Sequence, residues 1–515
     1  MASSSLRARV AARTRLARVA LRAAAVLAPA ASAAQAAHGP PAAYEATPAS
    51  LARHPVPAWF EDAKLGLFVN WGLYSVPGWA PTSGPVNEVI VNRGWKYWFA
   101  NNSYAEWYAN SMRLDGPTRA YHAKTYGAAF PYDSFAGQFE REARAFDAAR
   151  WADLFARVHA GYVVLDVKHH DGYKLWPSAN RNPRKAAWQS ARDFPGELGA
   201  AVRRRGMRYG LYYSGGIDWT FNDRTIADIG DLARALPRDS AYAAYVDRDY
   251  RELIARYQPD VLWNDIAYPA AANVNRLFAD YYAARPEGVV NDRWASAPGQ
   301  AAHADFTTPE YTTYAEITDR KWEATRGIGQ SFGFNRTEDA GSFLSVADLV
   351  WTFADVVSKN GNLLLNVGPR ADASIQEGQL ERLLGLGRWL DTNGDAVFGT
   401  RPWVEAEGRT GDSLEVRFTR KPGAVYAIVR GAPRAAELRL TNLHAEPGTT
   451  VTLLGGRGAL RWRQHGRDLV VAVPARGAAQ PAYALRIAPE PWRLVRERRR
   501  PAARGAALPG LPGDL

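Results

Sequence analysis

The chain has 515 residues, more than one ordinary domain needs, and 47% of them are hydrophobic, which is enough for a large core. Its formal net charge of +12 comes almost entirely from residues 1–39 and 491–515, which together carry +10 and leave about +2 on the rest. A nearly neutral body argues against a nucleic-acid-binding face. The absence of cysteine excludes disulfides and thiolate chemistry.

The first 39 residues have the composition of a targeting segment. They hold six arginines and no acid, with an Ala-rich run to Ala37 in which Ala31-Ser32-Ala33 fits a signal-peptidase site. This pattern predicts export to the periplasm or the outside. Arg22 interrupts the apolar stretch, and an Arg-rich, acid-free start also fits an organelle-targeting peptide. No later stretch of roughly 20 apolar residues occurs, so no membrane span is expected.

Residues 40–400 alternate between buried strands and helices. Helices are predicted over Phe146–His159, where Gly161 is the expected stop, and over 241–257 and 344–359. Strands are predicted over Leu65–Gly72, Tyr162–Val167, Met207–Ser214, Val261–Asp265, Val289–Trp294 and Leu363–Pro369, with 305–310 as a further candidate. Apolar strands with polar ends that alternate with helices predict a parallel (β/α) barrel, which carries its functional groups at the carboxyl ends of the strands.

After Arg401-Pro402-Trp403 the pattern becomes one of short strands. Apolar and polar residues alternate over 414–418, 437–440 and 483–487, and turn residues separate these runs. The alternation predicts an antiparallel β-sandwich over 401–490. Residues 491–515, rich in Arg, Pro, Ala and Gly, are expected to be a disordered basic tail.

Few side chains at the predicted strand ends can do acid–base or nucleophilic work. They are Asp166, His169, His170, Asp171, Tyr213, Asp218, Asp265, Asp292, Arg293 and Glu310. Neighbouring residues of a strand point to opposite faces, so the adjacent histidines do not predict a metal site, and no nucleotide-binding loop occurs. No metal or other cofactor is therefore expected. Two carboxylates at separate strand ends among aromatic residues indicate a retaining glycosidase.

Several longer motifs resemble one family, the α-L-fucosidases of glycoside hydrolase family 29, over roughly residues 55–405. The motifs are Trp59-Phe60, Lys64 to Phe68, Trp71 to Pro77, Ala105 to Tyr108, Lys168 to Tyr173, Gly210 to Ser214, Leu262 to Asp265 and Asn360 to Pro369. The resemblance implies a catalytic β/α barrel followed by a β-sandwich, without a cofactor. It also implies hydrolysis of terminal α-L-fucose from fucosylated glycans or glycosides.

The resemblance implies a role for each matching residue. Asp265 corresponds to the nucleophile and Glu310 to the acid/base, with Glu316 and Glu323 as nearby competitors for the second role. The residues that correspond to the lining of the family's sugar pocket are Glu106, Trp107, His169, His170, Tyr213, Trp263 and Arg293.

One position departs from the family's pattern. The family reads Phe-x-His-Trp-Gly at the first strand, whereas this chain has Asn70 in place of the histidine that touches the sugar. Asparagine donates and accepts hydrogen bonds with a different reach, so Asn70 is expected to bind the sugar differently. Two alternatives therefore accompany the fucosidase hypothesis: a fucose-like substrate such as an α-L-galactoside, or a sugar-binding protein without catalysis. Residues 83–100 are expected to form an inserted loop beside the sugar.

Overall fold

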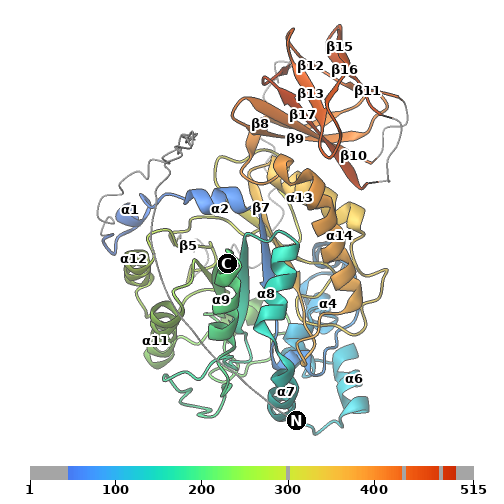
Figure 1. Cartoon of the computed structure of the whole chain (residues 1–515). Coiled ribbons are helices and arrows are strands. Elements are labelled where there is room, and N and C mark those ends of the chain that lie inside the picture. Colours follow the sequence, from blue (N-terminus) through green and yellow to red (C-terminus); the bar gives the residue numbers. More distant parts are fainter. Residues whose placement is uncertain (1–43, 297–301, 432–435, 475–479, 494–515) are drawn as a thin grey trace, which may run out of the picture. The chain divides into compact units, whose positions relative to one another are not determined.

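The structure is a computed structural model that describes residues 44–296, 302–431, 436–474 and 480–493 (Figure 1). The predicted targeting segment, 1–39, lies outside these residues, as does the basic tail from residue 494 onward. The expectation of disorder from residue 491 is wrong for Trp492–Arg493, which form the short strand β18 beside β12 (Leu443–His444).

A parallel sheet of seven strands forms the centre of the first domain (Figure 1). Its strands are β1 Leu65–Val69, β2 Tyr162–Lys168, β3 Arg208–Ser214, β4 Val261–Asp265, β5 Val289–Val290, β6 Trp322–Gly327 and β7 Gly361–Val367. The strand order is β5-β4-β3-β2-β1-β7-β6, and every neighbouring pair is parallel. Nearly all of these strand residues are buried, as expected for strands covered on both faces.

Residues 305–311 join the two edge strands of this sheet. The amide of Asp305 donates to the carbonyl of Val290 on β5, at 2.9 Å. On the other side, Thr307 and Glu310 make parallel bridges to Trp322 and Thr325 of β6. The segment therefore occupies the place of a further strand and closes the sheet, which confirms the predicted (β/α) barrel.

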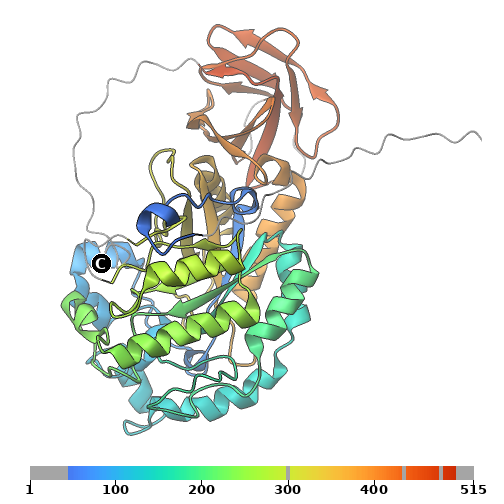
Figure 2. The same cartoon turned by 90° about the vertical axis from the view of Figure 1, so that its left-hand side faces the viewer.

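Helices lie outside the sheet, as Figures 1 and 2 show. They are α1 Pro48–Leu51, α2 Ala58–Ala63, α3 Val86–Arg93, α4 Trp95–Ala100, α5 Tyr108–Ser111, α6 Pro117–Thr125, α7 Phe135–Glu142, α8 Ala148–Arg157, α9 Phe194–Arg204, α10 Ile229–Ala235, α11 Ser240–Tyr257, α12 Val274–Ala284, α13 Val346–Ser358 and α14 Glu377–Asn393. Among the helices described, none is both long and apolar enough to cross a membrane.

Several elements begin or end at other residues than predicted. Asp147 caps the amide groups of Ala149 and Arg150, so α8 begins at Ala148 rather than at Phe146. The expected stop at Gly161 is wrong, because His159 already takes the left-handed conformation after α8, with φ 61°. The strand expected over Val289–Trp294 is only the two residues of β5.

The second domain is antiparallel, as predicted. Its strands are β8 Arg401–Arg409, β9 Glu415–Lys421, β10 Ala424–Arg430, β11 Glu437–Leu440, β12 Leu443–His444, β13 Thr450–Leu453, β14 Ala459–Leu460, β15 Trp462–His465, β16 Asp468–Ala472, β17 Ala482–Ala488 and β18 Trp492–Arg493. A six-stranded sheet, β14-β13-β17-β10-β9-β8, and smaller sheets share one apolar core that includes Phe418, Val425, Leu440 and Leu469. This arrangement is a β-sandwich.

Candidate active site

Asp265 is the last residue of β4, at the carboxyl end of the parallel sheet. Its Oδ2 accepts a hydrogen bond of 2.8 Å from the Tyr212 hydroxyl, and its Oδ1 accepts one of 3.0 Å from Nη1 of Arg293. The side chain is 11% exposed. Two donors thus fix the carboxylate while part of it stays open to a bound molecule.

The backbone directly after Asp265 is strained. Ile266 and Ala267 have φ values of 48° and 73°, a region that residues with a β-carbon rarely adopt. Gly216 makes room for this turn, because a Cβ at that position would lie 1.4 Å from the carbonyl oxygen of Ile266. Strain of this kind gathers at functional sites, where the surrounding structure holds it in place.

Arg293 joins Asp265 to a second carboxylate. Its Nη2 donates to Oε2 of Glu310 at 2.9 Å, while Nη1 donates to Asp265. Burial disfavours the guanidinium charge, but the carboxylates of Glu310 and Asp265 outweigh this and raise the pKa of Arg293. Glu310 also accepts a bond of 2.7 Å from the Tyr104 hydroxyl. One cation therefore lies between two carboxylates from different segments.

The two competing glutamates lie elsewhere. Glu323 is fully buried inside the barrel, where it accepts hydrogen bonds from Trp263 Nε1 and from the Tyr162 hydroxyl near the start of β2. Burial raises its pKa to about 7. Glu316 is exposed on the segment that precedes β6. Glu310, by contrast, contacts Arg293, which in turn contacts Asp265.

His169 and His170 follow β2 at the same end of the barrel. His170 Nδ1 lies 2.6 Å from Ser214 Oγ, and its Nε2 lies 3.9 Å from Asp265 Oδ2. Burial lowers the pKa of both histidines, which favours neutral rings. The ring of Trp107 lies edge-on to His170, with 5.0 Å between the ring centres. These rings form an aromatic wall beside Asp265.

Glu106 is a buried acid next to this wall. Its Oε2 accepts a bond of 2.8 Å from the amide of Gly333, and Ser331 Oγ lies 3.4 Å away. Burial raises the pKa of Glu106 to about 8, despite these hydrogen bonds. At neutral pH the protonated form is therefore favoured, and the group can donate a hydrogen bond.

Asn70 follows β1 directly and is buried. Its Nδ2 donates to Oδ2 of Asp166 at 3.3 Å, and the Tyr74 hydroxyl donates to the same oxygen at 2.9 Å. The predicted binding residue Asn70 thus lies beside an acid that the family motifs do not include.

Tyr213 is the one predicted site residue that the structure puts elsewhere. Its hydroxyl donates to Asp249 of α11 at 2.8 Å, on the outer face of the sheet. Successive strand residues face opposite sides, so its neighbour Tyr212 faces inward, stacks on Trp263 with 5.4 Å between ring centres and bonds to Asp265. The prediction for Tyr213 is therefore wrong. Alternation puts the two tyrosines on opposite faces, and the pairing of Tyr212 with Trp263 shows that Tyr212 is the one that faces the site.

The residues expected as an inserted loop form the helices α3 and α4. Asn87 of α3 donates to the backbone oxygens of Glu310 and Tyr311, at 3.4 and 3.3 Å. Trp98 of α4 packs edge-on against Tyr104, with 5.4 Å between ring centres. The segment does lie beside the site, but as two helices that support the residues around Glu310.

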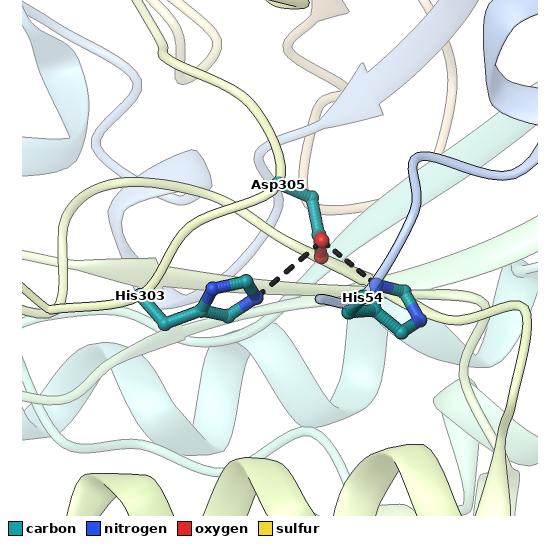
Figure 3. A group of neighbouring side chains, drawn as sticks. All are labelled: His54, His303 and Asp305. Carbon is teal, nitrogen blue, oxygen red and sulfur yellow. Dashed lines mark hydrogen bonds and ion pairs between the residues drawn. The ribbon is translucent and has the colours of Figure 1, made fainter. Parts of the chain in front are cut away.

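One group of possible metal ligands occurs among the described residues: His54, His303 and Asp305 (Figure 3). Asp305 lies between His54 and His303, at 2.9 and 3.5 Å from their nearest nitrogens. The other nitrogen of His54 faces the carbonyl of Pro286, and the Tyr282 hydroxyl bonds to both His303 and Asp305. Because the protein already satisfies these donor atoms, the group fits a structural hydrogen-bond cluster better than a metal centre.

Two family models match the chain. The model described as alpha-L-fucosidase matches residues 31–395, and that described as alpha-L-fucosidase C-terminal domain matches residues 412–488.

Individual proteins are similar over most of their length. Tissue alpha-L-fucosidase of Rattus norvegicus is 32% identical, over 81% of this chain and 85% of that protein, and the Homo sapiens protein is 32% identical over 82% and 86%. The crystal structure of Thermotoga maritima alpha-fucosidase with a mechanism-based inhibitor is 42% identical, with a TM-score of 0.78 over 86% of this chain and all of that one. Its complex with fucose gives a TM-score of 0.77 at the same identity and coverage.

Proposed function

Because this chain belongs to the α-L-fucosidase family of glycoside hydrolases, we propose that it removes terminal α-L-fucose from glycans by a retaining double displacement. Asp265 is the nucleophile and Glu310 the acid/base. Asn70, Glu106, Trp107, His169, His170, Trp263 and Arg293 hold the sugar. The observation that carries this assignment is the Arg293 guanidinium, which donates to Asp265 and to Glu310 at once.

In the first step, an oxygen of Asp265 attacks the anomeric carbon while Glu310 gives its proton to the glycosidic oxygen. The bond between the anomeric carbon and that oxygen breaks, and a fucosyl ester of Asp265 forms. The hydrogen bond from Tyr212 holds the second oxygen of the carboxylate during the attack.

In the second step, Glu310 takes a proton from water, and the water oxygen attacks the anomeric carbon. The ester bond breaks, Asp265 regains its charge, and fucose leaves with its original anomeric configuration. Arg293 stays beside both carboxylates and stabilises whichever of them is ionised.

The bridge by a single guanidinium also supports retention of configuration. Retaining enzymes hold their carboxyl groups roughly 5–5.5 Å apart, whereas inverting enzymes leave a wider gap for water. Two carboxylates bonded to one guanidinium fit the closer arrangement better.

A panel of aryl glycosides tests the activity and its alternatives. Hydrolysis of an aryl α-L-fucoside with retention of configuration supports the proposal. A faster reaction with the α-L-galactoside would favour the alternative sugar raised by Asn70, and binding without turnover would favour a lectin-like role.

Asp265→Gly should abolish turnover, and azide should restore part of it by filling the vacated space. Asp265→Asn, which leaves no such space, is the control.

We also propose that residues 1–39 direct export. The support is the Arg-rich, Ala-rich composition with its small-residue cleavage pattern. N-terminal sequencing of the protein recovered from the periplasm or medium of its host tests this. A chain that stays uncleaved inside the cell, or that is recovered from an organelle, would contradict export.

A further inference from the structure

Three neighbouring strands and the residue directly after β1 contribute one level of side chains beneath Asp265. Asp166 of β2 pairs with Tyr212 of β3, and Tyr212 pairs with Trp263 of β4. Val69 pairs with Leu165, so the next residue, Asn70, lies level with Asp166, to which it is hydrogen-bonded. Residues at one level of a parallel sheet point to the same face, and Tyr212 points inward to Asp265. We call Asn70, Asp166, Tyr212 and Trp263 the floor of the site.

Two of the four floor residues have a buried polar atom without a hydrogen-bond partner among the described residues. Among the described residues, no hydrogen-bond partner exists for Asp166 Oδ1 or for Asn70 Oδ1, although both side chains are almost fully buried, at 1% and 3% exposed. The nearby His169 Nδ1 is in the same condition, and its ring packs edge-on to Tyr74, which bonds to Asp166. Buried polar atoms normally have partners, so buried atoms without a partner near the Asp265 carboxylate indicate where a bound ligand completes the hydrogen bonding.

The protonation of Asp166 defines what such a ligand must offer. Burial, with the nearby carboxyls of Asp171, Glu106 and Asp265, raises the pKa of Asp166 well above its usual value, which favours the neutral acid. Oδ2 already accepts two hydrogen bonds, from Asn70 and Tyr74, so the proton belongs on Oδ1. The floor then presents a donor on Asp166 and an acceptor on Asn70.

A sugar hydroxyl accepts and donates at the same time, which matches this pair. We propose that Asp166 is a specificity-determining residue that, together with Asn70, binds one hydroxyl group of the sugar in the site. This rests on the proposed function. It also accounts for the chemistry at Asn70, because the acceptor on Asn70 lies beside the donor on Asp166, to which Asn70 is hydrogen-bonded.

The test measures kcat/KM for an aryl α-L-fucoside, its 2-, 3- and 4-deoxy analogues, and the aryl α-L-galactoside, which adds a hydroxyl at C6. Asp166→Leu keeps the approximate shape of the side chain and removes its hydrogen bonds. One pair of substrates in this panel differs only in the hydroxyl that Asp166 binds, and the wild type should have the higher kcat/KM for the member that carries it. In Asp166→Leu the ratio of the two kcat/KM values should be about tenfold smaller. Preferences at the other positions should be kept.

Asp166→Asn should restore most of the lost preference, because an amide N–H donates where the acid O–H does. Asp249→Asn removes another buried acid, on the outer face of the sheet. It should change kcat/KM by the same factor for all substrates. If Asp166→Leu does not fold, as judged by thermal unfolding, Asp166→Ala replaces it, because alanine also lacks a hydrogen-bonding side chain.

A loss of the same factor on every substrate in the Asp166 variant would overturn the proposal and leave Asp166 a structural role. A wild-type protein inactive on the whole panel would instead refute the proposed function. The two failures are therefore distinct.

Discussion

Glu310 and Glu323 differ in what surrounds them, although they lie on neighbouring segments, residues 305–311 and β6. Glu310 is 15% exposed and bonded to Arg293, whereas Glu323 is fully buried and bonded to Trp263. Glu310→Ala should lower the rate on a substrate with a poor leaving group by roughly 10²–10⁴, and much less on a dinitrophenyl fucoside, whose phenolate leaves without a proton.

Glu323→Ala is the matched control. It should lower the midpoint of thermal unfolding, because Trp263 and Tyr162 lose their buried acceptor, and its effect on turnover should not depend on the leaving group. Leaving-group dependence in Glu323→Ala but not in Glu310→Ala would show that the acid/base is misassigned.

Tyr212 and Tyr213 form a natural pair for a second prediction. Tyr212→Phe removes a donor to Asp265 and should lower kcat about tenfold, since a hydrogen bond to a charged group contributes roughly 1.5–3 kcal/mol. Tyr213→Phe removes a donor to Asp249 and should lower the free energy of unfolding by about 1–2 kcal/mol with turnover unchanged. Steady-state kinetics and urea unfolding of both variants check this, and an unfolding effect confined to Tyr212→Phe would refute it.

Glu106 should make stability depend on pH. Its pKa is about 8 in the folded protein against an ordinary 4.5, because burial disfavours its charge. The folded state therefore holds this proton more tightly than the unfolded chain does. The stability from this group is complete below about pH 4.5 and is lost as the pH rises through about 8.

Glu106→Gln removes this titration. Relative to the wild type, the variant should gain stability steadily between pH 5 and pH 9, by a few kcal/mol at most. Urea unfolding at several pH values measures the difference. A constant difference over this range would contradict the raised pKa.

Asp265 and Arg293 could be predicted from the sequence, because a charged residue soon after an apolar strand is unusual. Residues whose role depends on the register of the strands could not be predicted in this way. Tyr212 and Tyr213 are chemically alike, and only the pairing of Tyr212 with Trp263 shows which of them faces inward. The contact of Tyr104 with Glu310 spans 206 residues, so no local pattern could reveal it.

At the scale of elements, the His54–Asp305 pair fastens the segment before α2 to the barrel (Figure 3). Both side chains are fully buried, and the His54 ring stacks on Tyr282 of α12, with 3.8 Å between ring centres. His54→Ala should destabilise the protein by about 3 kcal/mol and speed amide exchange in residues 44–57, because it breaks a buried pair.

His159→Ala is the control, since its partner Asp391 and its own ring are 62% and 39% exposed, and exposed pairs contribute little. For Asp305, burial would raise the pKa, but bonds from His303 and His54 lower it overall. The stabilisation it gives is therefore present above pH 3.8 and lost as the pH falls through the lowered pKa. Equal amide-exchange rates in residues 44–57 of His54→Ala and His159→Ala would contradict the role of the His54–Asp305 pair.

Elements with a strong apolar period were predictable, including α11, α13 and β4. The strand β6 was not, because Glu323 and Arg326 interrupt its apolar pattern. Glu323 is accommodated inside the barrel by a hydrogen bond from Trp263 Nε1. The helices α3 and α4 were mistaken for a loop, since the short, aromatic run Trp95–Ala100 buries its rings against Tyr104 and Trp107 rather than along one regular face.

At the scale of the whole molecule, most of the 18 tryptophans serve packing. Trp71, for example, lies among Phe139, Phe146, Trp151 and Phe194 behind the barrel wall. A few contact residues of the proposed site: Trp107 packs against His170, and Trp263 lies under the Arg293 guanidinium. Aromatic richness thus reflects a large core first, and the site depends on where strand ends bring a few rings together.

The most direct test of this account is covalent trapping of the enzyme with a 2-deoxy-2-fluoro-fucosyl fluoride. The fluorine slows both steps, and the reactive leaving group lets the ester form without the acid, so the intermediate accumulates. Mass spectrometry of the intact protein should show one added fluorofucosyl group, and peptide mapping should find it on Asp265. A protein that turns over fucosides but carries the label on another residue, or forms no adduct, would contradict the double displacement through Asp265.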